Sequence, residues 1–190
     1  MESADHPIIK RAFDWLEQKN GENFLNPDEH CPTRDVFDAR YNRLVGELEA
    51  RGSWPKTYSL IAAIAGELAN NSFDHNLGMW RDEKGIYFRY DLSKKVIVIA
   101  DRGQGVLATL KHVKNELQTE DEAIKVAFTE FISGRAPEKR GNGLKFVAEQ
   151  VQKNGFTLRF YSNGSMYSVR SGLEKGQGKE LRGVLAILLI

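Results

Sequence analysis

The sequence predicts an α/β protein, a two-layer α/β sandwich in which helices cover one face of a mixed sheet. Three observations support this fold class. Helical patterns occupy the first part of the chain, a continuously apolar run spans residues 96–100, and one more helical pattern with three strand-like runs closes the sequence. Elements in this order bury their apolar faces against one another in separate layers. With 190 residues, the chain is long enough for one such core.

The first two helices are predicted over residues 8–18 and 34–50, where apolar residues recur at helical intervals. We assign residues 1–56 to a helical N-terminal extension and residues 57–190 to the main domain. The aromatic residues of the extension would either cover the core or form a homodimer or partner surface. They are Phe13, Trp15, Phe24, Phe37 and Tyr41.

The third helix, over residues 58–73, is apolar nearly all round, which is typical of a helix buried between layers. It nevertheless contains Glu67, Asn70 and Asn71. Unpaired polar groups inside a packed helix are costly. We therefore expect these side chains to face a ligand or a cavity.

The remaining elements are read from apolar runs and turn residues. Strands are predicted over 85–91, 95–100, 156–162, 165–171 and 182–190, and a helix over 143–153. Asn163-Gly164 is the strongest hairpin signal in the chain. Residues 106–140 are helical only in places, and residues 172–179 form a polar loop.

Composition limits the classes of partner. The chain has 27 Lys and Arg against 26 Asp and Glu, so its net charge of +1 gives no electrostatic case for nucleic acid or a membrane surface. A single cysteine, Cys31, excludes an internal disulfide and fits a reducing compartment. The N-terminus has no signal-peptide pattern, and the apolar last ten residues are too short to span a bilayer. We expect a cytoplasmic protein.

Three short motifs carry the functional prediction. They are Glu67-Leu-Ala-Asn-Asn71 on a helix, Asp101-Arg-Gly103-Gln-Gly105 after an apolar strand, and Gly141-Asn-Gly143-Leu144 opening another helix. In this order and context they resemble the Bergerat ATP-binding fold of the GHKL superfamily, which includes gyrase-type ATPases, heat-shock chaperones, histidine kinases and mismatch-repair ATPases. The resemblance covers residues 57–190.

The first motif places two polar side chains on one helical face, because Glu67 and Asn71 are one turn apart. An amide oxygen there can coordinate Mg²⁺ that also binds a triphosphate, and a carboxylate can orient or deprotonate the attacking group. The resemblance implies that Asn71 binds the metal and ATP and that Glu67 is the catalytic base. Taken alone, the segment would equally suit a solvated polar stripe.

The resemblance implies that Asp101 accepts a hydrogen bond from the adenine amino group, with Gly103 and Gly105 allowing the backbone close to the purine. A glycine-rich turn opening a helix presents free backbone N–H groups to phosphate, which is the implied role of Gly141, Gly143 and Leu144. Lys145 would add positive charge there. All of these are expected ATP-binding residues.

His75 lies two turns beyond Glu67 and resembles a histidine of the anti-sigma-factor serine kinases. It would contact phosphate, or it would simply interact with the last carbonyls of its helix. Residues between the second and third motifs correspond to the ATP lid of the family, although an ordinary surface loop would look the same.

Within the superfamily, the chain is nearest to the stand-alone anti-sigma-type serine kinases, since it shows neither a phosphoacceptor helix nor a sensor region. The resemblance implies ATP and Mg²⁺ as cofactors. It also implies an ATPase or protein kinase that transfers the γ-phosphoryl group to a partner protein in bacterial-type signalling. A nucleotide-gated protein-interaction switch is the alternative, because it needs the same motifs but no base. The identity of the partner stays open.

Overall fold

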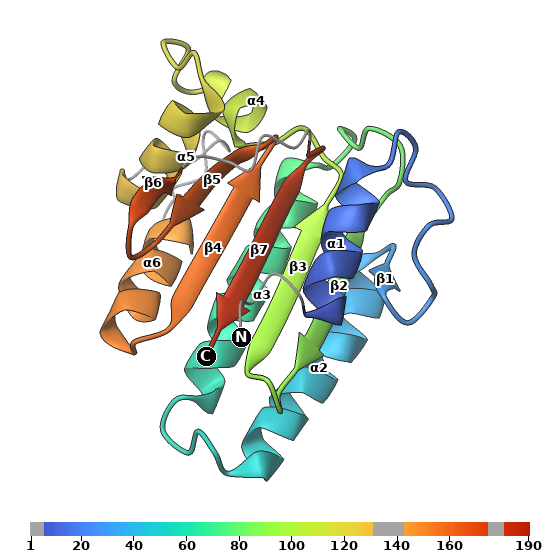
Figure 1. Ribbon diagram of the computed structural model, residues 1–190, viewed down its shortest axis with the longest axis vertical. Coiled ribbons are helices and arrows are strands. Elements are labelled where there is room, and N and C mark those ends of the chain that lie inside the picture. Colours follow the sequence, from blue (N-terminus) through green and yellow to red (C-terminus); the bar gives the residue numbers. More distant parts are fainter. Residues whose placement is uncertain (1–5, 131–142, 175–180) are drawn as a thin grey trace.

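The computed structural model describes residues 6–130, 143–174 and 181–190, and these form an α/β sandwich around one seven-stranded sheet (Figure 1). The strand order across the sheet is β1-β2-β3-β7-β4-β5-β6. The strands are β1 (His30–Cys31), β2 (Ile86–Asp91), β3 (Val96–Asp101), β4 (Thr157–Ser162), β5 (Ser165–Ser168), β6 (Gly172–Glu174) and β7 (Val184–Leu189).

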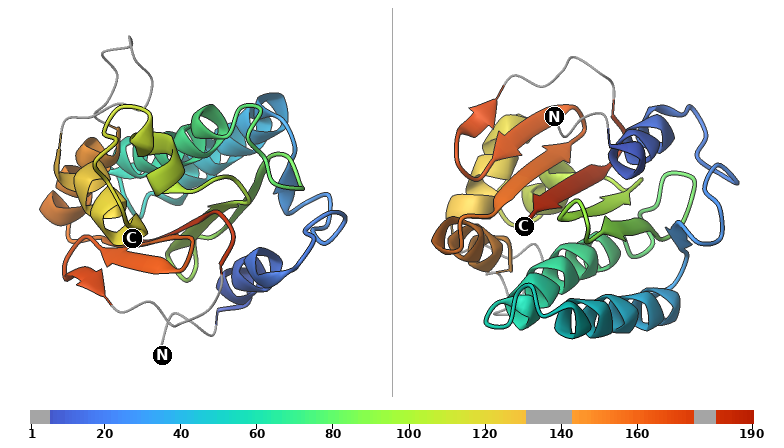
Figure 2. Two further views of the ribbon diagram at one scale, coloured as in Figure 1. Left: turned by 90° about the horizontal axis from the view of Figure 1, so that it is seen from above. Right: turned by 60° about the horizontal axis from the view of Figure 1, so that its bottom comes forward.

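The helices of the described residues lie on both faces of this sheet (Figure 2). They are α1 (Pro7–Glu17), α2 (Arg34–Arg51), α3 (Tyr58–His75), α4 (Val106–Lys111), α5 (Glu120–Thr129) and α6 (Gly143–Lys153). Helices α2, α3, α5 and α6 share one apolar cluster with the sheet, and α1 shares a second cluster with its opposite face. None of the helices described is long and apolar enough to cross a membrane.

The α/β sandwich is confirmed, but two details of the prediction are wrong. Every strand pair among the described residues is antiparallel, so the sheet is not mixed. The cause is the connections: β2–β3, β4–β5 and β5–β6 are joined by short turns, which impose antiparallel pairing, and β7 inserts antiparallel between β3 and β4. The helices are also not confined to one face, because α1 packs on the other.

Both N-terminal helices pack on the rest of the chain. Ile9, Trp15 and Leu16 of α1 are buried against the sheet, and the Tyr87 hydroxyl donates to the Ile8 carbonyl. Helix α2 packs along α3, where a β-carbon added at Gly66 would lie 3.2 Å from the Tyr41 hydroxyl. Cys31 in β1 is fully buried, and this burial raises the pKa of its thiol to about 11, although Arg40 opposes the shift.

The central strand β3 explains where the second motif points. All six of its residues are buried, with Ile97 and Ile99 in the helix-layer cluster and Val98 and Ala100 in the α1 cluster. Side chains alternate between the faces of a strand. Asp101, the last residue of β3, therefore belongs to the face that α3 covers.

Candidate functional site

The candidate site lies where α3, the loop after β3 and the first turn of α6 meet. Glu67 of α3 lies against Gly143 at the start of α6, so closely that a β-carbon on Gly143 would overlap its Oε1. At the end of α3, the Asn76 side chain donates from Nδ2 to Asp101 Oδ1 at 2.9 Å. Parts of all three predicted motifs thus come together around one helix.

Asp101 is 1% exposed, and its two carboxylate oxygens differ in their surroundings. Oδ1 accepts hydrogen bonds from Asn76 Nδ2 and from the Gly103 N–H, each at 2.9 Å. Oδ2 is buried and has no hydrogen-bond partner among the residues that the structure describes. A buried acceptor without a donor is costly, so this oxygen is the atom of the site best suited to a ligand N–H.

Burial raises the pKa of Asp101 to about 6. The nearby polar hydrogens of Ser72, Gly103, Asn76 and Val184 oppose this shift but do not cancel it. Desolvation disfavours the charged form of a carboxyl group, which is why burial acts in this direction. Near neutral pH the group is mostly ionised, yet a modest fall in pH protonates it.

Asn76 holds the second motif against α3. It is 3% exposed, and besides its bond to Asp101 it donates to the Ser72 carbonyl at 2.8 Å and accepts from the Gln104 N–H at 3.1 Å. Its amide therefore has partners on both the helix and the loop. The sequence prediction missed this role. The only available signal was a polar residue directly after a buried helix.

The two glycines of the second motif make room for side chains of the protein itself. A β-carbon on Gly103 would overlap the Asn76 amide, and one on Gly105 would overlap the Asn163 amide. Gly105 also has a φ of 83°, a conformation that favours glycine. The loop is thus built around glycine for both packing and backbone reasons.

Arg102, between Asp101 and Gly103, is a second structural residue that the sequence prediction missed. Its side chain is fully buried and bonds both carboxylate oxygens of Asp82, at 2.8 and 2.5 Å. It also donates to the carbonyls of Trp15 and Gln18 at the end of α1, at 2.5 and 3.0 Å. A cation at this position stabilises the C-terminal carbonyls of a helix. Arg102 therefore ties α1 to the candidate site.

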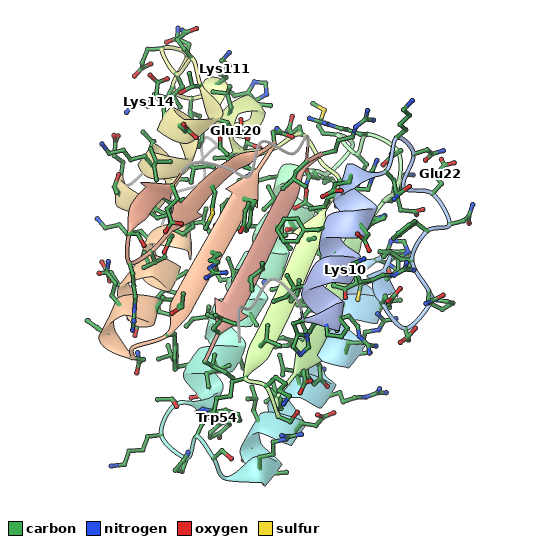
Figure 3. The ribbon with its side chains drawn as sticks, in the orientation of Figure 1. Lys10, Glu22, Trp54, Lys111, Lys114 and Glu120 are labelled. Atoms are coloured by element: carbon green, nitrogen blue, oxygen red, sulfur yellow. The ribbon has the colours of Figure 1, made fainter. Side chains whose placement is uncertain are left out.

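Glu120 anchors the other end of the same loop (Figure 3). Its carboxylate accepts the Val106 and Leu107 N–H groups at 2.9 and 3.2 Å, and also the Ser162 hydroxyl. These N–H groups open α4 and have no partner within the helix. Glu120 thus fixes the loop from Asp101 to α4 against β4, a role that no local sequence pattern indicated.

Glu67 and Asn71 are half-buried and lie one turn apart on α3. The Asn71 Nδ2 atom is buried without a hydrogen-bond partner in the described part of the chain. No group of three or more His, Cys, Asp and Glu side chains among the described residues could hold a metal. A metal at Asn71 would need further ligands from water or a bound anion.

The other predicted site residues lie near these groups or outside the described residues. Leu144 is half-buried and packs on the helix-layer cluster, and Lys145 follows it in the first turn of α6. His75 is the last residue of α3, and its carbonyl accepts the Gln104 side chain at 2.8 Å. Gly141 and the C-terminal part of the predicted lid segment, with its basic residues, fall outside the described residues, within 131–142.

Comparisons with known proteins do not assign the chain to a family. No protein-family model matches the chain, and a search of curated proteins finds no match either.

Proposed function

We propose that this protein binds Mg·ATP at the site between α3, the Asp101 loop and α6, and transfers the γ-phosphoryl group to a partner protein. The observation that carries the proposal is the convergence of the motifs: Glu67 lies against Gly143, while Asp101 is bonded to the end of the same helix through Asn76. The resemblance of these motifs to the GHKL superfamily supports the choice of ligand.

The chemistry of the residues suits the two ends of an adenine nucleotide. Asp101 offers a buried carboxylate oxygen that has no hydrogen-bond partner among the described residues. This oxygen would accept a hydrogen bond from the amino group of adenine, whereas guanine has no donor at the same position. The first turn of α6 begins beside Glu67, and the N–H groups of a helix start favour phosphate. Lys145 in that turn carries further positive charge.

Asn71 would hold the Mg²⁺ with its amide oxygen, and the bound ion would neutralise phosphate charge. Glu67, one turn earlier, would orient or deprotonate the attacking hydroxyl or imidazole of the partner. We place this activity in the cytoplasm, because one buried cysteine suits a reducing compartment. The partner protein would approach from the Glu67 side of the site.

Asp101→Asn should weaken Mg·ATP binding by about tenfold to a hundredfold, because a hydrogen bond to a charged acceptor contributes about 1.5–3 kcal/mol. The pKa of about 6 adds a pH signature. The affinity of the wild type should fall as the pH drops through 6, since protonation removes the charged acceptor, and the variant should lack this component. Calorimetric titrations from pH 5 to 8 measure both effects.

Asp38→Asn, an exposed change on α2, is the matched control and should bind as the wild type does. Stability gives an independent readout. The raised pKa means that the folded form keeps its proton when the unfolded form has lost it, so the free energy of unfolding should decline as the pH rises from about 4 to about 6. Unchanged ATP affinity in Asp101→Asn would contradict the adenine role.

Asn71→Ala should remove the Mg²⁺ dependence of ATP binding, because the proposed metal ligand is lost while Asp101 remains. The measurement is the ATP dissociation constant with Mg²⁺ and with a chelator, in wild type and variant. We expect the dissociation constant with chelator, divided by that with Mg²⁺, to be large in the wild type and near one in Asn71→Ala. Asn70→Ala, an exposed neighbour, is the control. A ratio that persists in Asn71→Ala would place the metal elsewhere.

A further inference from the structure

A groove runs along the outer edge of the sheet, away from the proposed nucleotide site. It has a volume of about 430 Å³ and is lined by residues of α2 and of the C-terminal half of β2, together with Asp28. This volume is in the range of pockets that bind small ligands or a few side chains. Figure 1 shows α2 behind this edge, with the short strand β1 beside only one end of β2.

Three arginines and two carboxylates line the groove. Both carboxylates already have partners. Asp28 accepts from Arg89 at 2.7 Å, and Glu47 accepts from the Tyr90 hydroxyl at 2.9 Å. Arg43 is exposed on α2 and forms no ion pair within the described residues. The groove therefore has a surplus of positive charge, centred on Arg43.

The third arginine, Arg40, has a structural role. Its guanidinium donates to the carbonyls of Pro27 and Asp28 and lies 3.4 Å from Cys31 Sγ. These contacts hold the segment that leads into β1. Because Arg40 makes these contacts and Arg89 is paired with Asp28, Arg43 is the groove cation that has no ion-pair partner among the described residues.

The backbone of β2 is open along the same groove. Strand β1 pairs only with Ile86 and Tyr87, and the Phe88 N–H donates to the Glu29 carbonyl at 3.0 Å. Alternate residues of an antiparallel strand turn their N–H and C=O groups to the same side. The N–H and C=O of Tyr90 therefore point to this outer edge, where the described residues place no further strand.

We infer that the groove binds an extended acidic segment of a partner protein, which adds a strand beside Phe88–Tyr90. Main-chain hydrogen bonds to the strand edge would supply affinity, and an acidic side chain of the segment would pair with Arg43. A second copy of this chain fits less well, because edge-to-edge pairing of two β2 strands would bring like charges together. The inference does not depend on the proposed nucleotide site.

The test is selection of random octapeptides displayed on phage against the full-length protein, followed by affinity measurements on the enriched peptides. We expect enriched peptides to carry Asp or Glu at a recurrent position. Arg43→Glu should weaken their binding about tenfold or more, since it reverses the charge at the contact. Lys111→Glu, the same charge change on exposed α4, should leave binding unchanged.

The strand-addition geometry has its own readout. Methylating alternate peptide nitrogens should abolish binding for one set of positions and spare the other, and bound peptide should slow hydrogen exchange at the Tyr90 amide. Enrichment without acidic residues, or equal affinity for wild type and Arg43→Glu, would overturn the inference. So would wild-type dimers that Arg43→Glu dissociates, because they would assign the groove to a second copy.

Discussion

Arg102→Met is expected to lower the free energy of unfolding by about 3–5 kcal/mol, the usual cost of breaking a buried ion pair from one side. The guanidinium is fully buried and bonds Asp82 twice, as well as two carbonyls at the end of α1. Methionine would fill the space but remove the charged donor, so that Asp82 would keep only the N–H groups of Glu83 and Gly21. Urea denaturation of wild type and variant at pH 7 measures the difference.

Two controls separate this effect from general loss of charge. Arg51→Met removes an exposed arginine at the end of α2 and should cost little. Arg102→Met combined with Asp82→Leu should recover part of the loss, because the half-buried Asp82 carboxylate then no longer lacks its cation. A cost in Arg102→Met as small as that in Arg51→Met would show that the buried pair does not stabilise the fold.

The ion pair between Arg102 and Asp82 also predicts how the free energy of unfolding changes in acid. Burial alone would raise the pKa of Asp82, but hydrogen bonds from Arg102 and from the Glu83 and Gly21 N–H groups hold it at about 2. A lowered folded pKa contributes stability that is present above the unfolded pKa of about 4 and is lost as the pH falls toward 2. This acid-dependent loss should be smaller in Arg102→Met than in the wild type.

Glu67→Gln should retain ATP binding but lose turnover by about a hundredfold or more, the typical contribution of a general base. Glutamine keeps the shape of the side chain against Gly143 and removes only its ability to accept a proton. Turnover is measured as ADP release, with the candidate partner present once it is known. ATP affinity is measured in parallel on the same samples.

The matched control is Glu149→Gln, an exposed change on α6 that should leave both quantities unchanged. Loss of ATP affinity together with turnover would indicate that Glu67 shapes the site and does not act as a base. Normal turnover in Glu67→Gln would rule out the base role altogether.

The long elements could be predicted because each carries a complete local pattern. Helix α3 was predicted over residues 58–73 and spans Tyr58–His75, and the strand that precedes Asp101 was predicted within one residue. The position of Asp101 followed from these, since a residue that ends a central strand lies at the edge of the core. Its side-chain face then follows from the alternation along β3.

The features that were missed depend on partners far along the chain. Arg102 is buried because it meets Asp82, 20 residues away, and the Trp15 carbonyl, 87 residues away. Glu120 is fixed by Ser162, which is 42 residues distant. The mixed sheet was wrong for the same reason, because the insertion of β7 between β3 and β4 is a long-range event that periodicity does not encode.

The bounds of the short elements could not be read from the sequence. Strand β1 has two residues, β6 has three and α4 has six, too few to show a period. Helix α5 has a capping box between Thr119 and Glu122, a local signal that would have located its start. The sequence therefore predicted the α/β class and the long elements, while the contacts between distant residues around the candidate site needed the structure.

Calorimetric titration of the wild-type protein with Mg·ATP, with Mg·GTP as the control, tests the central proposal most directly. We expect binding of ATP in clear preference to GTP, because Asp101 offers an acceptor to the adenine amino group, and slow ADP release from the same sample. ATP binding without turnover, also in the presence of the partner, would favour a nucleotide-gated switch. The absence of any ATP binding would contradict the proposed function.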